Sequence, residues 1–465
     1  MPKKQIAIIL QSILAMMLYF LLLQVLDRGQ HSISNLILAF SFCLIAQYLL
    51  NSEEDIFTVE KIIIYLFFVF GIFFRVILIK IFNEDFQSFA YVKLANKELY
   101  FINTSVIILI SILFFIIGKK ISKYRKIIKI VIINNTKFKE HLLILFYIIL
   151  ILITLIYKFN NIRLATSGYF GIYDNFVGML SSLAGFISIV FLVKFFKTKS
   201  IKYIILYLLY IIPEIIISFI NAWRGPIVFD ILLFFVALNA MKVKYNKTIT
   251  ILLILSIFLI TFPLITMYRT NLSYNKKIYE INVSNAVNYL SKNNLFRYLS
   301  GRFGYYDEIY LACNIDEATK IVYRNTSGLI HENILVGFIP RMIYTSKKII
   351  NIGRINAIIL TKLPEKVYNN IAISYIGELF INYSYWGVAI FNLLLGFIIG
   401  YINKMKDSNK TISISKYAFY GFTIIGFLEG DLAAKIIGLL SMVILINLVC
   451  FIFKIDEKER EILSM

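Results

Sequence analysis

The chain has 465 residues, of which 59% are hydrophobic and only 16% are charged. Soluble proteins carry about 25% charged residues, so this composition excludes a soluble multidomain protein and indicates a chain dissolved in lipid. The formal net charge of +21 does not require a nucleic acid partner, because basic residues beside transmembrane segments set their orientation.

Apolar runs long enough to cross a membrane follow one another along the chain. A crossing helix needs about 20 mostly apolar residues for a hydrocarbon layer of roughly 30 Å. Such runs occur near residues 5–26, 33–50, 61–81, 100–118, 142–158, 175–193, 203–220, 225–241, 249–267, 379–402, 417–429 and 433–453. We therefore predict an all-α polytopic membrane protein with about twelve transmembrane helices. Its parts are residues 1–267, a large loop at 268–374, and residues 375–465.

The basic residues predict which loops face the cytoplasm. Lys and Arg gather in the stretches 119–139, 194–202, 242–247 and 404–416, whereas the intervening loops hold few. Because basic residues near span ends stay inside, these stretches and both termini are predicted to be cytoplasmic. The loop at 268–374 then lies outside, and we expect short helices at the membrane interface within it.

Four charged residues fall inside predicted spans, where each costs about 2.5–3.5 kcal/mol to insert. They are Arg75, Glu214, Asp230 and Lys435, and the predicted topology puts all of them in the outer half of the membrane. Two interpretations stay open. The residues form structural ion pairs, in which arginines of neighbouring helices are the expected partners of Glu214 and Asp230, or they line a polar cavity open to the outer face.

The sequence contains none of the common nucleotide or metal motifs. It has no GxxxxGK[ST], HExxH or GxSxG, and its three cysteines form no CxxC pair. We therefore predict no cofactor and no metal site. The adjacent acids Asp307 and Glu308 of the outer loop are expected to be solvated surface, because neighbouring acids converge poorly on a cation.

Basic residues of the outer loop and its surroundings suit a phosphate ligand. An arginine offers a planar fork of donors that matches two phosphate oxygens and keeps its charge where water is scarce. Arg224 and Arg341 stand out because a Gly or Pro beside each fixes the backbone at a predicted membrane edge. The loop also contains Arg269, Arg302 and Lys348.

Three stretches resemble the Wzy-type O-antigen polysaccharide polymerases of bacterial plasma membranes. They are Asn221–Pro226 with its Arg-Gly turn, Phe338–Lys348 with its Pro-Arg element, and Ser374–Tyr383 with its Gly-Glu pair. The resemblance covers about residues 203–405 and includes the large outer loop late in the chain. It implies an enzyme that transfers an oligosaccharide from undecaprenyl diphosphate to the nonreducing sugar of another lipid-linked repeat unit. Membrane lipids and a chain-length regulator are further expected partners.

The resemblance also suggests roles for individual residues. Glu378 is the candidate general base for the acceptor hydroxyl, or it pairs with an arginine and fixes it. His331 is similar to the histidine of the related O-antigen ligases. The candidate catalytic residues are Glu378, Arg341 and Arg224, of which the two arginines contact the diphosphate. The other expected contacts to diphosphate or substrate are Arg269, Arg302, Lys348, Tyr305, Tyr306 and His331.

Two alternatives stay open on the sequence alone. A flippase or other transporter of lipid-linked oligosaccharide should show repeated halves and polar residues near the membrane midplane, and neither is evident. An O-antigen ligase would differ from a polymerase only in its acceptor. Turnover by the purified protein separates an enzyme from a flippase.

Overall fold

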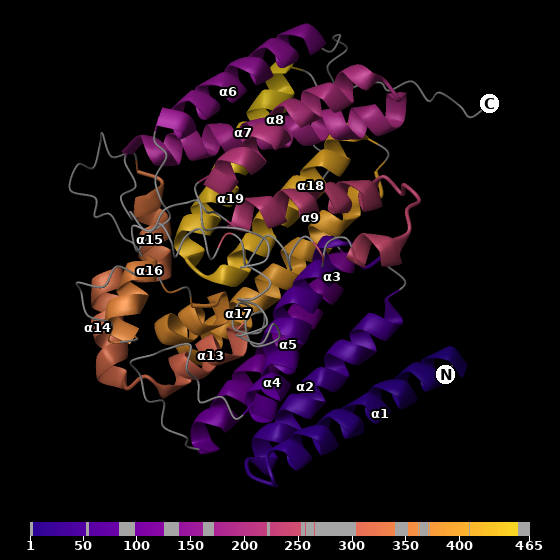
Figure 1. Ribbon diagram of the computed structural model, residues 1–465. Coiled ribbons are helices and arrows are strands. Elements are labelled where there is room, and N and C mark those ends of the chain that lie inside the picture. The colour runs from indigo at the N-terminus through magenta and orange to yellow at the C-terminus, as the bar shows by residue number, and fades with distance from the viewer. Residues whose placement is uncertain are drawn as a thin grey trace, which may run out of the picture. The chain divides into compact units, whose positions relative to one another are not determined.

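We describe a computed structural model of the chain (Figure 1). The structure describes residues 3–52, 55–82, 98–124, 139–160, 172–220, 224–252, 256, 265, 304–339, 352–360, 362, 371, 373–408 and 410–453. All regular elements in these ranges are helices, with no strand among them. Ten helical segments of this described part are long and apolar enough to cross a membrane. The prediction of an all-α polytopic membrane protein is therefore confirmed.

The chain divides into two compact units. Unit 1 comprises Met1–Lys126, Leu295–Tyr401 and Ile424–Ile437, and unit 2 comprises Ile127–Asn294, Ile402–Thr423 and Gly438–Met465. The first half of unit 1 is built from α1 (Lys3–Leu26), α2 (Ser32–Asn51), a continuous span formed by α3 (Val59–Ile63), η1 (Ile64–Phe74) and α4 (Arg75–Phe82), and α5 (Glu98–Tyr124). Helices α1 and α2 run side by side as a hairpin (Figure 1).

The described part of the predicted loop at 268–374 is helical. It contains α13 (Tyr305–Asn314), α14 (Glu317–Ser327), α15 (Ile330–Gly337), α16 (Ile352–Ile355) and η3 (Asn356–Leu360). Helix α14 begins at a cap in which the Asp316 carboxylate accepts the Thr319 N–H at 2.7 Å. Arg324 of α14 donates to the Ile381 carbonyl of α17 (Tyr375–Lys406) at 3.0 Å, which attaches the loop helices to a transmembrane helix.

Small residues let α5 and α17 approach each other closely within unit 1. Gly396 and Gly400 stand four residues apart on α17, and Gly118 lies on α5. A Cβ at Gly396 would overlap the Phe115 carbonyl, and one at Gly118 would overlap the Leu393 carbonyl. Glycines spaced in this way allow two membrane helices to pack backbone against backbone.

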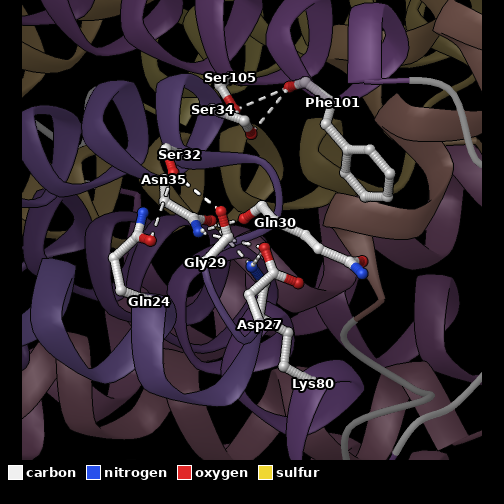
Figure 2. A network of polar contacts seen from close by, with 10 residues as sticks. All are labelled: Gln24, Asp27, Gly29, Gln30, Ser32, Ser34, Asn35, Lys80, Phe101 and Ser105. Atoms are coloured by element: carbon white, nitrogen blue, oxygen red, sulfur yellow. Dashed lines mark hydrogen bonds and ion pairs between the residues drawn. The ribbon is translucent and has the colours of Figure 1, made fainter.

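Polar networks join the helices of unit 1 at the two ends of the α3–η1–α4 span. At one end, the Lys80 ammonium donates to Asp27 Oδ2 and Asn35 Oδ1, both at 2.8 Å (Figure 2). At the other end, the ammonium of Lys119 on α5 donates to Glu60 Oε1. Since the charges at both ends have partners in other helices, the span is fixed along its axis.

Unit 2 is built around α6 (Glu140–Asn160), α7 (Ile172–Thr198), α8 (Ile201–Ile220) and α9 (Arg224–Ala240). The chain ends in α18 (Thr411–Ile425), η4 (Gly426–Glu429) and α19 (Leu432–Phe453), parts of which belong to each unit. The predicted start of the penultimate span at residue 417 was wrong, because α18 begins at Thr411. Its first turns carry polar residues that lower the hydropathy yet are buried, and Ser415 Oγ donates to the Thr411 carbonyl at 2.9 Å.

Candidate active site

Helix α17 is interrupted one turn and a half after Glu378. Ser384 has φ 57° and ψ −151°, which is not helical. The segment from Tyr385 to Lys406 is itself long enough to cross the hydrocarbon layer at about 1.5 Å per residue. Trp386 follows the break and is 78% exposed, as expected for a tryptophan at a membrane–water boundary. The short first part of α17, with Glu378, therefore lies at one end of the membrane-crossing helix.

The Glu378 carboxylate is buried against the start of another helix. Only 3% of Glu378 is exposed, and its Oε2 accepts the N–H of Leu432, the first residue of α19, at 3.1 Å. The first N–H groups of a helix have no partner within it and carry partial positive charge, so they stabilise a carboxylate. The N-terminus of α19 thus favours the ionised form of Glu378, against the burial of the carboxyl group.

A strained turn brings the start of α19 to Glu378. Gly430 has φ +75°, and a Cβ there would overlap the Ile373 carbonyl and lie 3.6 Å from Glu378 Oε2. Asp431 has φ 55°, a left-handed conformation that costs energy in a residue with a side chain. Glycine is required at 430 because both the backbone angle and the available space exclude a side chain.

Further charges surround this turn. Burial raises the pKa of the Asp431 carboxyl, and the Lys435 ammonium acts against that rise. Lys435 lies one turn into α19, donates to the Gly426 carbonyl, and has its ammonium 4.0 Å from Glu429 Oε2. The start of α19 therefore combines one ammonium with several carboxyl groups.

Asp307 of α13 is buried and Glu308 is half-buried, so the prediction that this acidic pair is solvated surface was wrong. Arg75 of the third span donates through Nε to Asp307 Oδ2 at 3.1 Å and through Nη2 to the same oxygen at 2.7 Å. The exposed fractions are 3% for Arg75 and 1% for Asp307. The partner of the Arg75 charge is therefore the Asp307 carboxylate of a loop helix. Sequence alone did not reveal this pair because the two residues are 232 positions apart.

Glu308, the second acid of this pair, lies beside the first turn of α17. Burial raises its pKa well above the ordinary value, hydrogen bonds from Ser374 act against that rise, and the charges of Asp307 and Glu429 add to it. Its Oε2 is buried and has no hydrogen-bond partner in the described part of the chain. This environment favours the protonated form of the carboxyl group.

Besides Glu378, three of the sequence-predicted site residues are described with their side chains, and all three lie in unit 1. Tyr305 and Tyr306 of α13 are 8% and 2% exposed, and Tyr305 packs on Phe67 with ring centroids 4.6 Å apart. His331 of α15 is exposed, and its Nδ1 lies 2.8 Å from the hydroxyl of Tyr383, which is on α17 with Glu378. Glycan contact by these residues stays a prediction.

The predicted cationic residues are not placed at Glu378 by the described structure. Arg224 begins α9 in unit 2, and only its backbone is described. Arg341, Arg269, Arg302 and Lys348 lie outside the described residues. Their contacts to a diphosphate therefore stay predictions.

Tyr323 is a residue of this region that the sequence did not indicate. It lies on α14, is 1% exposed, and has its hydroxyl within electrostatic range of Glu378 and Asp431. A single tyrosine in a short polar helix carries no local signal, because its surroundings arise from the packing of α14 on α17.

A second buried polar cluster lies within unit 2. The Lys158 ammonium of α6 donates to both carboxylate oxygens of Glu214 on α8 at 2.7 Å and to Ser181 Oγ on α7 at 2.9 Å. Arginine was the expected partner of Glu214, and a lysine is found. Asp230 of α9 lies within electrostatic range of Glu214 and Lys158. The interpretation of Glu214 as part of a structural ion pair is therefore the one that the geometry favours.

No three His, Cys, Asp or Glu residues within the described ranges are arranged to hold a metal ion. The fold defines a polytopic membrane protein in which buried acidic residues lie at one end of a membrane-crossing helix. The chain belongs to the family described as O-antigen polysaccharide polymerase Wzy, whose model matches residues 7–456. Polymerisation of polysaccharide repeat units is the activity of that family. No curated protein and no solved structure matches the chain.

Proposed function

We propose that the protein joins oligosaccharide repeat units carried on undecaprenyl diphosphate, at the outer face of the bacterial plasma membrane. The observation that carries this proposal is the buried Glu378 carboxylate at the start of α19, at one end of a membrane-crossing helix, in a chain of the Wzy family. The distribution of basic loops supports cytoplasmic termini, which puts the first part of α17 on the outer side.

In the proposed reaction, the Glu378 carboxylate accepts the proton of an acceptor sugar hydroxyl. The hydroxyl oxygen forms a bond to the anomeric carbon of the donor. The bond from that carbon to the diphosphate oxygen breaks, and its electron pair leaves with the undecaprenyl diphosphate. A base held within hydrogen-bond reach of the attacking hydroxyl speeds such a step by about 10²- to 10⁴-fold.

The leaving diphosphate develops negative charge, which fixed cations stabilise. Arg224 and Arg341, with Arg269, Arg302 and Lys348, are the proposed donors. Removing one preorganised donor of this kind costs about 3–4 kcal/mol of transition-state stabilisation. This arrangement calls on neither a nucleotide nor a metal.

The proposal is tested with purified protein in detergent and lipid-diphosphate-linked repeat units, without nucleotide sugars and with EDTA. We expect a glycan ladder on a gel, and we expect Arg341→Ala to abolish it. The absence of a ladder from folded protein with authentic substrate would refute the polymerase and point to the flippase or the ligase. A ladder that is lost with EDTA would refute the metal-independent mechanism alone.

A further inference from the structure

Three buried polar atoms without a partner lie near the first turns of α17, which carry Glu378. They are Tyr323 Oη of α14, Glu308 Oε2 of α13 and Asn382 Oδ1 of α17, and none has a hydrogen-bond partner within the described ranges. Such atoms are few in folded proteins because each costs about 1–3 kcal/mol, and a binding or catalytic role is one reason for their presence.

The three atoms come from elements that meet at the first turns of α17. Gly377 lies against the Glu308 backbone, since a Cβ at residue 377 would be 3.3 Å from the Glu308 carbonyl. Asn382 is one turn beyond Glu378 and donates through Nδ2 to the Glu378 carbonyl at 2.8 Å. That bond fixes the orientation of the amide, so Oδ1 is the atom left without a donor. The Tyr323 hydroxyl lies within electrostatic range of the Glu378 and Asp431 carboxyl groups, which places it beside the start of α17.

The hydrogen-bonding character of these atoms selects a ligand class. Asn382 Oδ1 only accepts, Tyr323 donates, and the Glu308 carboxyl does either. A phosphate at neutral pH offers acceptors almost exclusively, so it leaves Asn382 unsatisfied, and the carboxylates of Glu378 and Asp431 repel it. A sugar hydroxyl donates and accepts at once and satisfies all three.

We infer that Tyr323, Glu308 and Asn382 form the subsite for the hydroxyl groups of the acceptor sugar, separate from the diphosphate subsite. This inference rests on the proposed function, because Glu378 is the base that the subsite serves. Burial raises the pKa of Tyr323, so its hydroxyl stays a donor at neutral pH. Tyr323 is the most readily tested of the three, since Tyr323→Phe removes one oxygen and keeps the ring.

The experiment measures binding of two probes to the full-length protein in detergent. The first probe is the repeat-unit oligosaccharide, freed of lipid and phosphate, from the source strain lacking this protein. The second is farnesyl diphosphate, which carries the diphosphate without a sugar. The matched control is Tyr420→Phe, because Tyr420 in unit 2 is also buried and its hydroxyl also has no partner in the described part.

We expect Tyr323→Phe to weaken oligosaccharide binding about 3- to 10-fold and to leave farnesyl diphosphate binding unchanged. Its thermal unfolding midpoint should stay the same or rise, because an unsatisfied buried hydroxyl is removed. Tyr420→Phe should change neither affinity. If Tyr323 had only a structural role, Tyr323→Phe would change the binding of both probes to the same extent.

Three results would overturn the subsite: equal oligosaccharide affinity in Tyr323→Phe and wild type, a selective loss of farnesyl diphosphate binding, or no oligosaccharide binding by wild type. Failure of the proposed function looks different. In that case the wild-type protein and Tyr323→Phe differ in oligosaccharide affinity as expected, and yet the wild-type protein makes no glycan ladder.

Discussion

Glu214 in unit 2 and Glu378 in unit 1 are both buried acids of apolar helices, but their charges are accommodated differently. Glu214 receives both of its carboxylate bonds from a lysine ammonium, whereas Glu378 accepts a backbone N–H from the start of α19. An acid paired with a side-chain cation depends on that cation for its stability. A helix N-terminus favours the charged form of an acid through backbone N–H groups rather than through a side-chain cation. The first arrangement suits a structural role and the second a reactive one.

The largest expected effect comes from Glu378→Gln. The amide keeps an oxygen for the Leu432 N–H but cannot accept a proton from a sugar hydroxyl, so the polymerisation rate should fall about 10²- to 10⁴-fold. The unfolding midpoint by circular dichroism should change little. The measurement is the initial rate of ladder formation with lipid-linked repeat units.

Glu332→Gln is the matched control for this prediction. The Glu332 carboxylate accepts the Leu329 N–H at 3.1 Å, the same kind of bond at the same length as in Glu378, but Glu332 is exposed on α15. Its substitution should leave the rate within about twofold. Comparable rates for Glu378→Gln and wild type would remove Glu378 from the reaction.

The second prediction concerns the paired acid. Lys158→Ala leaves Glu214 buried without its cation and beside Asp230, which should lower the unfolding free energy by about 3–5 kcal/mol. The measurement is denaturant unfolding in detergent micelles. The double variant Lys158→Met, Glu214→Gln removes both charges and should recover most of the loss. If Lys158→Ala is as stable as the wild type, the pair is not structural.

The comparison also shows what the sequence predicts well and what it does not. Hydropathy located the last span at 433–453, and α19 covers Leu432–Phe453, because about 20 apolar residues are a local property. The Gly-Glu motif singled out Glu378. The partners Leu432 and Asp307 were not predictable, because a backbone N–H has no side-chain signature and Arg75 and Asp307 are 232 residues apart in the sequence.

The third prediction tests the turn that brings α19 to Glu378. Gly430→Ala puts a side chain at φ +75° and against the Ile373 carbonyl, so it should destabilise the protein by about 1–3 kcal/mol. It should also lower the polymerisation rate, because Leu432 shifts away from Glu378. Gly438→Ala on α19 is the control, since a Cβ there meets no atom within 4 Å. A stable and active Gly430→Ala variant would show that the turn is not required.

The smallest expected effect is a pH dependence of stability caused by Glu308. Its pKa is raised by burial, so the folded protein keeps a proton that the unfolded chain releases above its ordinary pKa of about 4.3. Stability is then greatest below that value and falls as the pH rises toward the raised pKa. Glu308→Gln stays neutral at every pH, so it should be more stable than wild type at pH 7–8 and equal to it near pH 4. Part of the slope should persist in the variant, because burial also raises the pKa of Asp431. Parallel stability curves for the two proteins between pH 4 and 8 would mean that Glu308 is ionised in the folded state.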